Sequence, residues 1–96
     1  DVETAQEAAR ACAINLLAQL RAAVEGDWNR VVRCVRLGGF IACTPDFKDH
    51  AKIVNGASDL IVGALGDAGR HARTSIGVSA LPLGAAVEVE GMFEIR

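Results

Sequence analysis

The sequence has few aromatic residues and no tyrosine, because one tryptophan and three phenylalanines supply its whole aromatic content of 4%. Its 10 basic residues are outnumbered by 12 acidic ones and form no basic run. Proteins that bind nucleic acids usually present a cationic stripe and aromatic side chains on which bases stack. Neither feature is present, so the sequence disfavours nucleic-acid binding.

The three cysteines, Cys12, Cys34 and Cys43, show no CxxC spacing. We expect them to be small buried side chains in a protein of a reducing compartment, which we take to be the cytoplasm. His50 and His71 lie far apart and form no paired-ligand pattern, so no metal site is expected. No apolar run approaches the roughly 20 residues needed to span a bilayer, and no signal peptide is seen, so a membrane partner is not expected either.

A chain of 96 residues is expected to form one domain, residues 1–96, with a modest core. The composition is nevertheless 51% hydrophobic, and the mean hydropathy is +0.27. Such an excess suggests that some apolar surface is buried against a second copy of the chain. The alternative is that an alanine-rich first helix raises the hydrophobic fraction of the chain without any apolar surface being buried between copies.

Two segments have helical periodicity. Thr4 and Glu7 fit a capping box that opens the first helix, and Gly26 is a natural stop. Asp49 can cap the second helix, and Gly66 and Gly69 end it. The expected apolar stripes comprise Ala9, Ala13, Leu16, Leu17, Leu20 and Val24 in the first helix, and Ile53, Val54, Ala57, Leu60, Ile61, Ala64 and Leu65 in the second.

Three segments are typical of strands. The first runs over residues 30–43, with a bulge or a close backbone approach expected at Gly38 and Gly39. The others cover residues 72–81 and 86–95, and a turn around Pro82 and Gly84 joins them as neighbouring strands. The order α–β–α–β–β predicts an α+β fold with two helices on one face of the sheet. The opposite face is left open, and the glutamates of the last strand, Glu88 among them, should point there.

Arg73 and Glu88 are the leading site candidates. A guanidinium can bind a carboxylate through two parallel hydrogen bonds, and a glutamate on the neighbouring strand can accept or donate a proton. Arg73 is otherwise a solvated arginine at a strand end. Glu88 is unusual because glutamate is depleted in strands, and its alternative explanation is a solvent-facing sheet surface.

Two further residues are weaker candidates. Asn55 is a mediocre helix former that can aim an amide into a site, or it is simply an exposed polar residue. Ser75 follows Arg73 by two positions and shares its face, but no histidine spacing marks it as a nucleophile.

The whole pattern resembles the RidA/YjgF family of small trimeric proteins. The segments that carry the resemblance are Asn15-Leu16-Leu17, Val31 to Val35, Asp46-Phe47, Val54-Asn55, Ala72-Arg73-Thr74-Ser75-Ile76-Gly77-Val78, Leu81-Pro82 and Val87-Glu88-Val89-Glu90. Together they extend over essentially the whole sequence. The family signature is an Ala-Arg-Ser, alternating apolar residues, a Leu-Pro and a strand that contains glutamate.

The resemblance implies a chorismate-mutase-like mixed sheet backed by two helices, assembled as a homotrimer with sites in clefts between subunits. The family's best-known members hydrolyse reactive imines and enamines to 2-oxo acids and ammonia without a metal or cofactor. By this resemblance Arg73 would bind the substrate carboxylate, and Glu88 would position or activate water. Asn55 would line the cleft, and Ser75 stands where many members have a cysteine near the ligand.

Three alternatives stay open at this point. One is a non-catalytic trimer that binds a small carboxylate, another is an endoribonuclease, and the third is a ferredoxin-like regulatory domain. Family members begin with a hairpin that carries a tyrosine and a Ser-Gly segment. This sequence begins at Asp1, just before the first helix, so we expect an amino-terminal hairpin to be missing.

Overall fold

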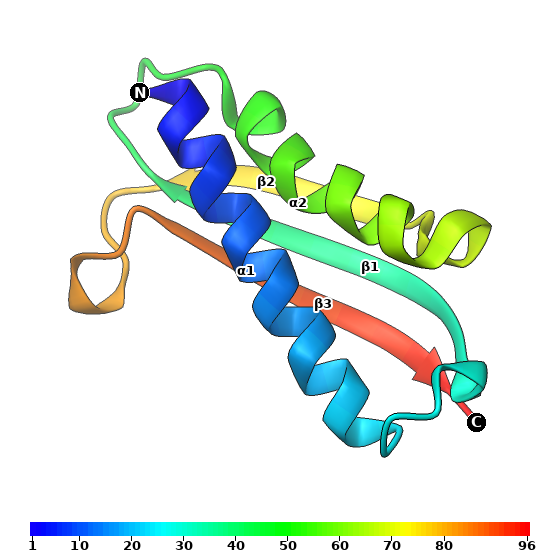
Figure 1. Cartoon of the computed structure of the whole chain (residues 1–96). Coiled ribbons are helices and arrows are strands. Elements are labelled where there is room, and N and C mark those ends of the chain that lie inside the picture. Colours follow the sequence, from blue (N-terminus) through cyan, green and yellow to red (C-terminus); the bar gives the residue numbers. More distant parts are fainter.

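The computed structural model describes residues 1–96 and places two helices on one face of a three-stranded sheet (Figure 1). Helix α1 spans Val2–Ala23 and helix α2 spans His50–Leu65. Strands β1, β2 and β3 span Val31–Ala42, Ala72–Val78 and Val87–Ile95. The predicted α+β class and the element order are therefore confirmed.

The order of the strands in the sheet is β2-β1-β3, so β1 lies in the centre. Strand β2 pairs with β1 in parallel, and β3 pairs with β1 antiparallel. A parallel pair needs a crossover connection, which α2 supplies. The prediction that β2 and β3 are neighbours was wrong, because α2 returns the chain to one edge of β1 and β3 occupies the other. Glu88 is consequently opposite Phe40 of β1 and not opposite a residue of β2.

The core lies between the helices and the sheet. Its buried residues are Ala9, Ala13, Cys34, Leu37, Ile41, Ile53, Val54, Ala57, Ile61 and Val87. These include four members of the stripe predicted for α2, while Leu60 and Leu65 are partly buried against the same core. Cys34 is buried as expected, whereas Cys12 and Cys43 are only half-buried.

Two glycines allow neighbouring elements of this core to approach closely. A methyl group at Gly39 would collide with the side chain of Val54, and one at Gly56 would collide with the backbone oxygen of Gln6 in α1. The predicted close approach is thus confirmed at Gly39, whereas Gly38 faces the exposed side chain of Glu90. The alternative of a bulge there was wrong, because both register shifts of β1 fall earlier, before Arg36.

Two element ends differ from the prediction. The N-cap of α1 is Asp1, whose carboxylate accepts a hydrogen bond from the backbone nitrogen of Thr4 at 2.8 Å, so Thr4 already lies inside the helix. Strand β2 ends at Val78 and not at Leu81, because its ladder with β1 ends where β1 itself ends.

The face of the sheet that lies away from the helices is open, as predicted. Glu88, Glu90, Met92 and Glu94 point there from β3 and are exposed. Neither helix is both long enough and apolar enough to cross a membrane.

Candidate functional site

Arg73 lies on β2 and reaches across to α2. Its Nη1 donates a hydrogen bond to Oγ of Ser58 at 3.1 Å, and its Nη2 donates to the carbonyl oxygen of Ala51 at 3.3 Å. The side chain is half-buried and forms an ion pair with no carboxylate. The guanidinium is therefore oriented by neutral acceptors, and its charge is left for an anion.

His71 extends this arrangement on the other side of Ser58. Its Nδ1 lies within hydrogen-bond distance of the carbonyl oxygen of Gly69, and its Nε2 lies 2.9 Å from Oγ of Ser58. A carbonyl oxygen can only accept, so Nδ1 carries a proton, and in the tautomer with that proton alone Nε2 accepts from the Ser58 hydroxyl. That hydroxyl can then accept from Arg73, so every donor in the series meets an acceptor.

Asn55 and Ser75 lie on the same side of the sheet as Arg73. Asn55 follows Ala51 by four residues and precedes Ser58 by three, so it shares their helix face. It is half-buried, and its amide makes no hydrogen bond within the chain. The hydroxyl oxygen of Ser75 is buried and has no partner either. The same side of the sheet as Arg73 therefore carries one buried hydroxyl without a partner and one partly exposed amide.

The strands contain three arginines and three glutamates, and their pairing is selective. Arg33 binds Glu94 at 3.0 Å, and Arg36 lies 3.5 Å from Glu90 while also donating to Thr74. Arg73 and Glu88 remain without a charged partner. These two residues therefore differ from the other four in having no counter-charge, although Arg73 also joins β2 to α2 through its hydrogen bonds to Ser58 and Ala51.

Glu88 does not lie with the other candidates. It projects from the open face of the sheet, on β3, whereas Arg73 projects toward α2 from β2, and β1 separates the two strands. A single chain thus places Arg73 and Ser75 on the face of the sheet toward α2, which carries Asn55, and leaves Glu88 on the opposite face. A pocket that used both charges would need a second copy of the chain.

Sequence reasoning missed Ser58 and His71 as neighbours of Arg73. Alternation continued back from the start of β2 could have found His71, because it precedes Arg73 by two residues. The three-residue spacing from Asn55 could have found Ser58. No group of three or more His, Cys, Asp or Glu side chains is placed to hold a metal ion.

The sequence was also compared with known proteins. A family model described as "YjgF/chorismate_mutase-like, putative endoribonuclease" matches residues 1–94. The chain belongs to this family. The fold and the family resemblance predicted from the sequence are therefore confirmed.

Individual relatives agree with this assignment. The chain is 47% identical to Protein TCP17 of Trypanosoma cruzi over 96 residues, which is 99% of this chain. The crystal structure of the protein Atu1372 from Agrobacterium tumefaciens, of unknown function, superposes with a TM-score of 0.97 at 46% identity over 100% of this chain. The crystal structure of a "putative endoribonuclease" from Shewanella oneidensis MR-1 superposes with a TM-score of 0.93 at 32% identity over 99% of this chain.

The chain is shorter than these relatives. It spans 59% of the length of Protein TCP17, and 61% and 62% of the two chains in the crystal structures. The relatives therefore extend beyond the segment whose fold is described above.

Proposed function

We propose that the protein hydrolyses small, carboxylate-bearing imines or enamines to 2-oxo acids and ammonia, in a cleft between the subunits of a homotrimer. The observation that carries the proposal is the pairing of charges on the strands. Arg33 and Arg36 have carboxylate partners, whereas Arg73 is oriented by Ser58 and Ala51 and has none.

Arg73 would bind the substrate carboxylate. A guanidinium presents parallel N–H groups that match the two oxygens of a carboxylate, and partial burial strengthens such a charge-assisted bond. Asn55 and Ser75 lie on the same side of the sheet, and the amide of Asn55 and the unpartnered hydroxyl of Ser75 can hydrogen-bond the remainder of a small polar molecule. The ligand would then be fixed with its reactive carbon at a defined place, which is a large part of catalysis when that carbon is already electrophilic.

Glu88 would act from another subunit. Water adds to the carbon of the C=N bond, and the Glu88 carboxylate accepts one proton from that water. That proton passes to the nitrogen and gives a carbinolamine. The hydroxyl proton of the carbinolamine then moves to the same nitrogen, the C–N bond breaks, and ammonia leaves as the carbonyl forms. One water is consumed for each ammonia released, and no oxidation occurs.

The test is hydrolysis of 2-iminobutanoate by the full-length protein, followed as release of ammonia and 2-oxobutanoate. Arg73→Ala should reduce kcat/KM by about 100-fold or more, since it removes the charge that holds the substrate. Arg70→Ala is the matched control, because Arg70 lies three residues away, is exposed and pairs only with Asp67. Equal rates for Arg73→Ala and the wild type would refute the mechanism, and a wild type without activity would refute the substrate assignment.

Two other functions give different results in the same assay. A trimer that only binds small carboxylates would be stabilised by 2-oxobutanoate and release no ammonia. An endoribonuclease has in its favour the family description and the name of the Shewanella protein. Against it, two of the three strand arginines are neutralised by glutamates, and the net charge is −2. Salt-sensitive RNA binding and cleavage would decide for that activity.

A further inference from the structure

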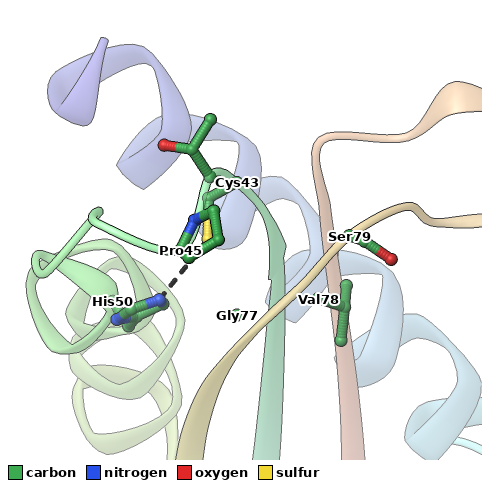
Figure 2. Close-up of a pocket in the computed structure, with 7 residues that line it drawn as sticks. Cys43, Pro45, His50, Gly77, Val78 and Ser79 are labelled. Atoms are coloured by element: carbon green, nitrogen blue, oxygen red, sulfur yellow. Dashed lines mark hydrogen bonds between the residues drawn. The ribbon is translucent and has the colours of Figure 1, made fainter.

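Cys43 and His50 meet where β1 ends and α2 begins. Cys43 directly follows β1, and His50 is the first residue of α2. The Sγ atom of Cys43 lies 3.5 Å from Nε2 of His50, and both side chains are half-buried (Figure 2). This contact joins residues that are seven positions apart, so the intervening loop brings them together.

Two neighbours hold the pair in place. Phe47 packs edge-on against the imidazole of His50, with ring centroids 5.2 Å apart and an interplanar angle of 82°. Gly77 of β2 lies beneath both side chains, and a Cβ atom there would come within 2.6 Å of both the Cys43 sulfur and the His50 Nε2. The absence of a side chain at residue 77 is therefore what lets the thiol and the imidazole lie together.

The pair borders an open hollow of about 390 Å³. This volume is at the lower end of the range of small-molecule sites. Its other lining residues are Thr44, Pro45, Gly77, Val78 and Ser79, which contribute no charge. Cys43 also borders a second, mostly apolar hollow of about 530 Å³ beside the start of α1.

The Cys43 thiol lies beside a side chain that can act as its base. The proton of the Cys43 thiol can pass to Nε2 of His50, and the thiolate is the nucleophilic form of cysteine. The positive end of the α2 macrodipole lies at His50, close to where the negative charge would develop. The charged residues next to His50 in sequence are Lys48, Asp49 and Lys52, and the Asp49 carboxylate lies 3.9 Å from Lys52.

We propose that Cys43 and His50 form a nucleophilic thiol–imidazole pair that adds covalently to small electrophiles of the α,β-unsaturated carbonyl class. Sγ bonds to the β-carbon while the C=C π bond breaks, and its electron pair moves toward the carbonyl. The α-carbon then takes the proton that His50 received from the thiol. The net reaction adds S–H across a double bond, with no leaving group and no oxidant. Gly77 lies four residues farther along β2 than Arg73, or about 13 Å. The Arg73 guanidinium nevertheless reaches the same end of α2, because it donates to the carbonyl oxygen of Ala51, the residue after His50.

Acrylamide is a suitable probe, with peptide mass spectrometry giving the rate of addition at each of the three cysteines in the full-length protein. Cys12 and Cys34 are internal controls, because burial raises the pKa of both thiols. At pH 7 we expect Cys43 to react about tenfold or more faster than either. A rate at Cys43 no higher than at Cys12 would overturn the proposal.

The contribution of His50 is tested by His50→Gln. This substitution should slow addition at Cys43 by about tenfold at pH 6.5 and by much less at pH 9, where an unassisted thiol is largely ionised. Ser79→Ala is the matched control, since Ser79 lines the same hollow and makes no hydrogen bond to the pair. An unchanged pH profile in His50→Gln would overturn the assignment of His50 as the partner.

Gly77→Ala provides a second variant that keeps both reactive groups. Its methyl group would force the thiol and the imidazole apart, so the rate at Cys43 should fall while the rate at Cys12 stays constant. An unaltered Cys43 rate in a folded Gly77→Ala protein would contradict the proposal. Cys43→Ser should abolish the adduct and leave imine hydrolysis intact, which separates this site from the proposed function.

Discussion

Arg73 and Glu88 project from opposite faces of one sheet, on strands that flank β1 from either side. No change of rotamer can bring a guanidinium and a carboxylate together around an intact central strand. If both act on one substrate, each must come from a different chain. This arrangement allows a test of the proposed function that does not depend on a structure of the assembly.

The first prediction concerns mixed assemblies of two inactive variants. Arg73→Ala and Glu88→Ala should each be nearly inactive alone, because every site lacks one of its two charges. Reassembled together in equal amounts, about a quarter of the sites should combine an intact Arg73 with an intact Glu88, because each partner is drawn at random. Recovery of about a quarter of wild-type hydrolysis is therefore expected. If the mixture stays inactive, the two residues do not share an inter-subunit site.

The second prediction concerns the hydroxyl that orients Arg73. Ser58 is 9% exposed and accepts from the guanidinium while it donates to His71. Ser58→Ala should raise KM for the imine by about 5- to 20-fold, the size expected for the loss of one or two hydrogen bonds, and change kcat less. Steady-state kinetics provide the check. Asp59→Ala, at the exposed next position of α2, should change neither parameter.

The third prediction concerns the closest approach of the two helices. Gly56→Ala would place a methyl group against the backbone oxygen of Gln6, which cannot move without displacing α1. We expect it to lower the free energy of unfolding by about 1–3 kcal/mol, as overpacking does in other cores. Urea denaturation measures the change.

Gly63 provides the matched control for this prediction. It lies in the same helix, and a methyl group there would meet nothing within 4 Å. Gly63→Ala should raise stability by about 0.5–1 kcal/mol, because alanine is the better helix former. If Gly63→Ala also lowers the free energy of unfolding, the loss of stability in Gly56→Ala is not explained by contact with α1.

The fourth prediction concerns alkaline pH. Burial raises the pKa of the Cys34 thiol, so the folded protein keeps this proton at a pH where the unfolded chain has lost it. The unfolded state then binds fewer protons, so the free energy of unfolding must fall as pH rises above about 8.5. The slope for one thiol is at most about 1.4 kcal/mol per pH unit. Cys34→Val should reduce the slope between pH 8 and pH 10; an identical slope in both proteins would contradict this assignment.

Local patterns were enough to predict both helices, all three strands and the open face of the sheet. The apolar stripes of the helices and the alternation in β3 are set by residues close together in sequence. The order of the strands was not predictable in this way. The turn at Pro82 and Gly84 resembles a hairpin connection, but the pairing of β1 with both other strands depends on the path of α2 through space.

The candidate site shows the same division. Arg73 and Ser75 share a face because they alternate along one strand, and that part of the prediction followed from spacing. The contact between Arg73 and Ser58 joins a strand to a helix across 15 positions, and no local pattern encodes it. The Cys43–His50 contact likewise depends on an intervening loop and on the space left at Gly77.

The central position of β1 also has a consequence for how the chain folds. β1 precedes both of its partners, Ala72–Val78 and Val87–Ile95, which lie far downstream. During synthesis the backbone donors and acceptors of β1 lack their partners in the sheet until β2 and β3 have been synthesised. Helices α1 and α2 can form from local contacts alone, whereas closing the sheet requires two long loops to be ordered. Sheet assembly should therefore limit the folding rate, and substitutions in β3 should slow folding more than equally destabilising ones near the start of α1.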